Sequence, residues 1–190
     1  WYVCCTPLAP YANFLLEMPS TANRLLMGFM NKKFKTDFFL YYNATVWRIY
    51  EKNQTGSYVI VGVPDPISGG PLIGGDWYGE SFQDFAGDGR LTYPAMDGPI
   101  PTQRIKMIRD GIEDWMYLDM LEKAVDNSSD MSAEWHSTAI KEMAVEDELV
   151  TSLIEWTTDP ALVIRKIELP RSSEKEIKRI GKYEITHNFP

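Results

Sequence analysis

Aromatic, amide and carboxylate side chains gather in or beside three short apolar segments of the sequence. The segments are residues 1–5, 37–42 and 90–93. The side chains in question are Tyr2, Tyr41, Tyr42, Asn43, Trp47, Asp88 and Tyr93. Flat rings pack against the C–H faces of sugars, and Asn and Asp accept hydrogen bonds from hydroxyls. The pattern therefore indicates a carbohydrate partner, although Tyr2 and Tyr41 fit a role in the core equally well.

Two groups of acidic residues further along the chain are candidates for catalytic acids, because most glycosidases use two carboxylates about 5 to 9 Å apart. The first lies in residues 109–114, where Arg109 and Glu113 stand four residues apart and can pair locally on a helix. The second, Asp147-Glu148, falls in a late helical stretch without aromatic neighbours. We therefore assign both groups to solvated helix faces and neither to catalysis.

The sequence gives no signal for a bound metal or cofactor. Cys4 and Cys5 are adjacent, whereas the Cα atoms of disulfide-bonded cysteines usually stand about 5.5 Å apart. Zinc sites use spaced Cys and His ligands, and the two histidines, His136 and His187, are distant in the sequence. The Gly-Gly pairs lack the strand-then-helix context of a phosphate loop. We expect no cofactor, and both cysteines to be small buried side chains.

Composition places the chain among ordinary globular proteins and narrows its partners. It has 190 residues, of which 44% are hydrophobic and 13% aromatic, enough to form a core. A formal charge of −8 provides no basic face for phosphate backbones or anionic lipids, so we expect no nucleic-acid partner. No apolar run approaches the roughly 20 residues of a membrane span. We expect a soluble chain.

Three N-x-S/T sequons occur, at Asn43, Asn53 and Asn127, which is more than this composition produces by chance. They hint at a secreted, cell-envelope or lumenal protein. Asn43 belongs to the candidate sugar site, so Asn53 and Asn127 are the better glycan acceptors.

The candidate site residues must be positioned by short strands that alternate with helices. Residues 1–5 and 37–42 are predicted as buried strands, and the second has the continuous apolar character of a strand in a parallel sheet. A helix is expected between them, from Pro19 to about Lys33. A third short strand is expected over 90–93.

A long helix is expected after Pro101-Thr102, followed by two helical stretches over about 132–145 and 146–156. The residues predicted to form the buried face of the long helix are Ile105, Ile108, Ile112, Trp115 and Met116. The stretch 48–89 is rich in Gly and Pro and is predicted as a long loop, in which only Tyr58–Val61 forms a strand.

This order of elements predicts an α/β fold. It matches the last units of a (β/α)8 TIM-type barrel or a doubly wound sheet, and in both the ligand binds at the carboxyl ends of the strands. Three strands cannot close a barrel, and the chain opens at Trp1 within an apparent strand, without an initiator Met or signal segment. We therefore expect the C-terminal portion of a barrel over 1–126, with a long 48–89 loop, and a C-terminal helical extension over 127–190 packed on it. The N-terminal part of the same barrel is then missing.

Several segments follow one another in an order and spacing that are specific as a set. They are Trp1–Cys5 with Pro7, Asn13-Phe14 with Pro19, Arg24–Leu26, Phe39–Tyr42 with Trp47, Gly87–Pro94, Pro99–Thr102 with Arg104, Arg109–Asp114 with Tyr117-Leu118, and Leu149–Leu153 with Thr158–Pro160. Together, over about residues 1–168, they resemble the C-terminal part of glycoside hydrolase family 123.

The resemblance implies a barrel enzyme that hydrolyses β-linked N-acetylhexosaminides, with N-acetylgalactosamine favoured. In that family the 2-acetamido group of the substrate is the nucleophile, and an adjacent Asp-Glu pair orients it and transfers the proton. The pair lies upstream of the matched segments, so the resemblance implies that this chain holds no catalytic residue. We expect the chain to supply substrate-binding residues alone, namely Tyr2, Tyr42, Asn43, Trp47, Asp88 and Tyr93.

The sequence departs from the family pattern at Phe38, Tyr42 and Thr45, where members usually have Gly, Trp and Asn. Phe38 implies altered barrel packing, and Tyr42 a smaller stacking face. An alternative reading is a non-catalytic carbohydrate-binding or scaffold domain derived from such a barrel. A third is an interaction domain that binds protein through Trp77 and Tyr78 of the long loop.

Overall fold

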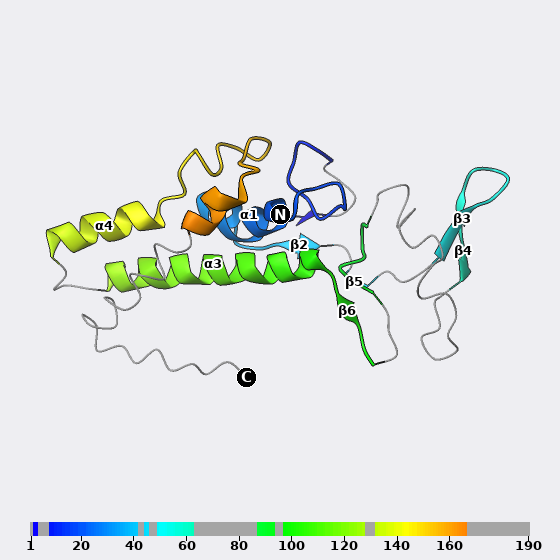
Figure 1. The fold of residues 1–190 in the computed structure, drawn as a ribbon, viewed down its shortest axis with the longest axis horizontal. Helices are drawn as coiled ribbons and strands as arrows, with labels where there is room; N and C mark the ends of the chain where they lie inside the picture. Colours follow the sequence, from blue (N-terminus) through cyan, green and yellow to red (C-terminus); the bar gives the residue numbers. More distant parts are fainter. Residues whose placement is uncertain are drawn as a thin grey trace.

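The computed structural model describes residues 2–3, 8–41, 44–45, 49–62, 87–93, 97–127 and 132–166. Figure 1 shows α3 running along the helical body, with α4 at one end of the molecule and the β3–β4 hairpin at the other. The elements in chain order are β1 (Tyr2–Val3), α1 (Ser20–Leu25), the π-helical turn η1 (Leu26–Met30), α2 (Asn31–Lys33), β2 (Leu40–Tyr41), β3 (Ile49–Lys52), β4 (Tyr58–Gly62), β5 (Thr92–Tyr93), β6 (Ile100–Pro101), α3 (Gln103–Asp126) and α4 (Ala133–Met143).

The first half of the chain forms a strand, helix and parallel strand in the predicted order, but β2 covers Leu40–Tyr41 within the predicted 37–42, and Phe38 and Leu40 are exposed and not buried as expected. β1 pairs with β2 in parallel, with Tyr2 opposite Leu40 and Val3 opposite Tyr41. The helical segment α1–η1–α2 connects the two strands and covers residues 20–33, within the predicted limits. The α/β class is therefore confirmed. Among the described residues the sheets are two-stranded, so they do not by themselves form a barrel.

The third predicted strand does not extend this parallel sheet. β5 pairs antiparallel with β6, with Thr92 opposite Pro101 and Tyr93 opposite Ile100. An isolated antiparallel bridge joins Thr45 to Arg90. The apolar run over 90–93 does not by itself specify a partner strand, and the nearby Pro99–Pro101 segment supplies one for the backbone of β5.

The 48–89 stretch contains more regular structure than predicted. β3 and β4 form an antiparallel hairpin, so a strand precedes the predicted one. Its turn runs from Asn53 to Gly56, where the Gly56 N–H donates to the Asn53 carbonyl at 2.9 Å and Gly56 has φ 78°. Asn at the first position and Gly at the fourth are typical of a type I turn. Trp77 and Tyr78 lie outside the described residues.

Helix α3 begins at a side-chain cap and buries a face that overlaps the predicted one only in part, since Ile105 and Ile108 are partly buried against the core. The Thr102 hydroxyl accepts from the Ile105 N–H at 3.3 Å and donates to the Leu91 carbonyl at 2.6 Å. The buried residues of the helix are Arg104, Gly111, Asp114, Leu118, Leu121 and Val125, whereas Ile112 is 42% exposed. The face is rotated because two charged side chains with buried partners and a glycine face the core.

Gly111 brings α3 into backbone contact with the α1–η1 segment. A Cβ placed on Gly111 lies 2.5 Å from the Arg24 carbonyl oxygen, and one on Gly28 lies 2.8 Å from the Gly111 carbonyl oxygen. Beside this contact Arg24 donates to both carboxylate oxygens of Asp114, at 2.6 and 3.0 Å. The Asp114 side chain is buried, so this bidentate pair fixes how the two helices meet.

The C-terminal part packs on the same core, but it is not the helix predicted over 146–156. Residues 144–159 form turns with an antiparallel bridge between Val150 and Trp156, and a short helix follows over 160–166. The Thr157 N–H donates to the Leu149 carbonyl at 2.9 Å, so local turn bonds replace helical ones. Leu149, Val150 and Val163 join the core around Phe14. The division at residues 126 and 127 stays a prediction.

No helix in the described part of the chain is both long and apolar enough to cross a membrane. Cys4 and Cys5 lie outside the described residues, so their predicted burial stays a prediction.

Replacing Gly111 by Ala tests the backbone contact between the helices. In an ordinary helix this change stabilises by about 1 kcal/mol, but here the new Cβ meets the Arg24 carbonyl. We expect the free energy of unfolding to fall by about 1–3 kcal/mol in urea denaturation. Lys106→Ala, on an exposed position of the same helix, is the control and is expected to change stability by less than about 0.5 kcal/mol. A Gly111→Ala variant as stable as the parent would contradict the contact.

Candidate functional site

The candidate site lies at the carboxyl end of β2, where Tyr41 meets the turn Gly87–Gly89. The Tyr41 hydroxyl donates to Oδ1 of Asp88 at 3.1 Å and accepts from the Gly89 N–H at 2.8 Å. Gly87 and Gly89 have φ of 79° and 68°, in the left-handed region that glycine adopts without strain. The sequence Gly-Asp-Gly therefore allows the tight turn that brings Asp88 back onto β2.

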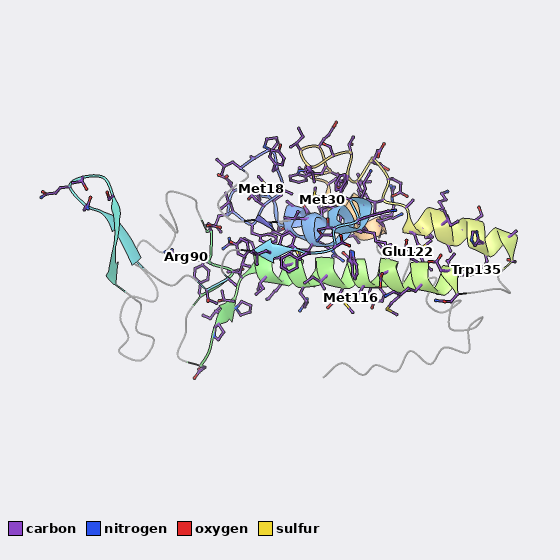
Figure 2. The ribbon with its side chains drawn as sticks, turned by 180° about the vertical axis from the view of Figure 1, so that it is seen from behind. Met18, Met30, Arg90, Met116, Glu122 and Trp135 are labelled. Atoms are coloured by element: carbon purple, nitrogen blue, oxygen red, sulfur yellow. The ribbon has the colours of Figure 1, made fainter. Side chains whose placement is uncertain are left out.

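Arg104, at the start of α3, anchors the Gly87–Gly89 turn through hydrogen bonds. Its Nη1 donates to the carbonyls of Phe14 and Gly87, the latter at 2.7 Å, and its Nη2 donates to the carbonyl of Arg90. These carbonyls belong to two separate loops, which the planar guanidinium joins. Figure 2 shows Arg90 near the end of α3 at which the helix begins, whereas Met116 and Glu122 lie farther along it.

The loop after β1 forms the other side of the site. The Phe14 ring packs edge-on against the ring of Tyr41, with centroids 4.9 Å apart, and lies 5.8 Å from the ring of Phe39. Asn13 is buried beside it and accepts from the Leu15 N–H at 2.9 Å, while its carbonyl accepts from the Asn23 side chain at 2.8 Å. The loop is thus tied to α1 and presents Phe14 to β2.

Burial controls the ionisation of the two central polar side chains. Desolvation, followed by the charge of Asp88, raises the pKa of Tyr41 well above its usual value, so the phenol stays neutral. Its one proton is committed to Asp88. Burial lowers the pKa of Arg104, against the opposing effects of Tyr41, Tyr93 and Asp88, which favour the cation.

The predicted site residues differ in burial, and some of them lie outside the described residues. Asp88 is 0% exposed and Tyr93 is half-buried, and both face Arg104 closely enough to affect its pKa. Because Asp88 is covered, it reaches a ligand only if the turn moves. Tyr2 is described through the β1 backbone alone. The predicted residues that lie outside the described ones are Tyr42, Asn43 and Trp47.

Arg104, Asn13 and Phe14 were not predicted as site residues. Asn13-Phe14 and Arg104 stood among the segments that resemble a known family, but a pattern of residue types did not single them out. In the described part of the chain, no group of three or more His, Cys, Asp and Glu side chains is arranged to hold a metal.

Replacing Tyr41 by Phe tests the link between β2 and the Gly87–Gly89 turn. The change keeps the ring against Phe14 but removes the donor to Asp88 and the acceptor for the Gly89 N–H. We expect a loss of about 1–3 kcal/mol in the free energy of unfolding, because buried polar groups lose their partners. Tyr11→Phe, at an exposed position, is the matched control and is expected to leave stability unchanged. Equal stabilities of the two variants would contradict the link.

The stability difference between the parent and Tyr41→Phe also depends on pH. Folding raises the pKa of Tyr41, so the contribution of its protonated form is complete below the unfolded value of about 10 and is lost as the pH rises above it. We expect the difference between the two proteins to be constant from neutral pH to about pH 9 and to shrink at higher pH. Urea denaturation across this range measures it, and a difference that grows above pH 10 would contradict the burial of a neutral phenol.

Comparison with known families identifies the chain. Residues 1–121, which include β1, β2, the Gly87–Gly89 turn and most of α3, match the family described as Glycoside hydrolase 123, catalytic domain. A comparison with curated proteins gives no match. The matched residues contain Tyr41, Asp88 and Arg104, so the site described above lies within the catalytic-domain sequence. The chain therefore belongs to the glycoside hydrolase 123 family.

Proposed function

We propose that the protein carrying this chain hydrolyses β-linked N-acetylhexosaminides, with N-acetylgalactosamine favoured. The observation that carries the proposal is the match of residues 1–121 to a glycoside hydrolase catalytic domain, at the end of the β1–β2 pair where ligands bind in α/β proteins. The acetamido oxygen of the substrate attacks the anomeric carbon, and an acid protonates the departing glycosidic oxygen. An Asp-Glu pair upstream of Trp1 supplies that acid.

The same proposal treats β1 and β2 as two neighbouring strands of a (β/α)8 barrel. Their parallel pairing through a helical crossover supports this arrangement. Phe38, two residues before β2, and Leu40, its first residue, are 66% and 46% exposed. Further strands and helices of a barrel would cover them.

Within this site the residues divide into a supporting group and a contacting group. Tyr41 and Asp88 belong to the supporting group. The Tyr41 hydroxyl donates its proton to Asp88, and the Asp88 side chain is buried. Tyr93, which interacts with Arg104, is only half-buried, and we assign its exposed part to contact with a sugar. The proposed contacting residues are Tyr2, Tyr42, Asn43, Trp47 and Tyr93.

The number of N-x-S/T sequons, three where the composition predicts about one, supports a further part of the proposal, that the protein enters the secretory route. A glycosidase there meets glycans and glycolipids, the carbohydrate partners that the site is proposed to bind.

The test is an assay of the full-length gene product on chromogenic β-N-acetylgalactosaminide and β-N-acetylglucosaminide. We expect both to be hydrolysed, the first faster, and the matching β-galactoside, which lacks the acetamido group, to remain intact. Trp47→Ala is expected to lower kcat/KM about tenfold or more through the lost ring contact, whereas Tyr11→Phe should not change it. Hydrolysis of the β-galactoside would contradict substrate assistance. Binding of N-acetylgalactosamine without hydrolysis would instead favour a non-catalytic carbohydrate-binding domain.

A further inference from the structure

The sequon Asn53-Gln54-Thr55 occupies the turn of the β3–β4 hairpin. Residues 53–57 are all exposed, and the hairpin projects from the helical body of the molecule (Figure 1). The turn is closed by the Asn53 N–H, which donates to the Ser57 carbonyl at 2.9 Å, and by the bond from the Gly56 N–H to the Asn53 carbonyl. The sequon is therefore presented on an ordered and accessible turn.

The hydrogen bonds of this turn fix the orientation of the Asn53 side-chain amide. Its Oδ1 accepts from the Thr55 N–H at 3.0 Å, from the Thr55 hydroxyl at 2.7 Å and from the Ser57 N–H at 2.9 Å. All of these donors belong to Thr55 and Ser57 of the same hairpin loop, so Oδ1 faces inward. The Nδ2 group, on the opposite side of the amide carbon, then faces solvent.

Asn127, the first residue of the sequon Asn127-Ser128-Ser129, has the opposite arrangement, and the two serines lie outside the described residues. Asn127 follows the last turn of α3, and its Nδ2 donates to the Lys123 carbonyl at 2.7 Å. The same carbonyl also accepts from the Asn127 backbone N–H at 3.1 Å, so the side-chain amide of Asn127 lies against the end of the helix. A transferase would have to draw Nδ2 away from this carbonyl to reach the nitrogen. Asn43, in the third sequon, lies outside the described residues.

From this contrast we infer that Asn53 is the site of an N-linked glycan and that Asn127 is not. In the reaction, Nδ2 of Asn53 forms a bond to the anomeric carbon of an oligosaccharide carried on a polyprenyl diphosphate. The bond between that carbon and the diphosphate oxygen breaks, and its electron pair leaves with the diphosphate. The amide nitrogen gives one proton to a base of the transferase. The product is bulky and hydrophilic, which an exposed turn accommodates.

The inference can be tested independently of the proposed hydrolysis, because the glycan is detected by peptide mass and not by enzyme activity. The full-length gene product is made in cultured animal cells behind a secretion signal, and its peptides are mapped with and without peptide N-glycosidase in heavy-oxygen water. The microsomal fraction is mapped in the same way, so that retained protein is also counted. We expect the peptide containing Asn53 to carry glycan and the peptide containing Asn127 to be unmodified.

Matched variants separate loss of the acceptor from loss of the turn. Asn53→Asp keeps the Oδ1 acceptor, and so the turn, but has no amide nitrogen, and Thr55→Ala removes the sequon hydroxyl. Both are expected to abolish the glycan on this peptide, whereas Asn127→Gln should leave it unchanged. An unmodified Asn53 peptide from folded parent protein would overturn the inference. Occupancy of Asn127 equal to that of Asn53 would overturn it as well.

Discussion

The buried guanidinium of Arg104 is the interaction on which the site depends. It is 6% exposed, and it donates to carbonyls of the loop after β1 and of the turn before β5. Isolated burial of a cation is costly, so the arrangement is stable only because several acceptors surround it. Gly87 has to be glycine here, since a Cβ would lie 2.7 Å from Nη1 of Arg104 and 2.6 Å from Cγ of Leu16.

Other parts of the fold act on the site through the two loops that Arg104 joins. The turn carries Asp88 to Tyr41, and the loop after β1 places Phe14 against the Tyr41 ring. The C-terminal part reaches the same loop, where Nε1 of Trp156 donates to the Pro10 carbonyl at 3.1 Å. The family match ends at residue 121. Trp156, which lies after this residue, therefore helps to hold a loop of a site that lies within the matched residues.

The elements that the sequence predicted are those with strong local signals. The parallel β1–β2 pair follows from the continuous apolar run before Tyr42, and the helical segment between the strands begins directly after Pro19, as its sequence signal indicates. The antiparallel pairing of β5 with β6, and the turn bonds and Val150–Trp156 bridge in the segment predicted as a helix, join nearby residues without a helical or alternating period, so periodicity did not predict them.

The supporting residues of the site were missed for a related reason. The acceptors through which Arg104 joins the two loops are backbone carbonyls, which any residue provides, so residue types carry no trace of these contacts. On a helix, Arg104 looks like a solvated cation. The predicted contacting residues Tyr42, Asn43 and Trp47 lie outside the described residues and stay predictions, whereas Asp88 lies in the site but beneath its surface.

Amide hydrogen exchange in Arg104→Lys tests the central role of this guanidinium most directly. Lysine keeps the charge but, with a single nitrogen, does not span carbonyls on both loops. The amides of Gly89 and Leu91, which donate to the Tyr41 hydroxyl and the Ala44 carbonyl, are predicted to exchange at least about tenfold faster. Those of α4, and all amides of the exposed control Arg109→Lys, are predicted to be unchanged. Unaltered protection of Gly89 and Leu91 in Arg104→Lys would contradict the account.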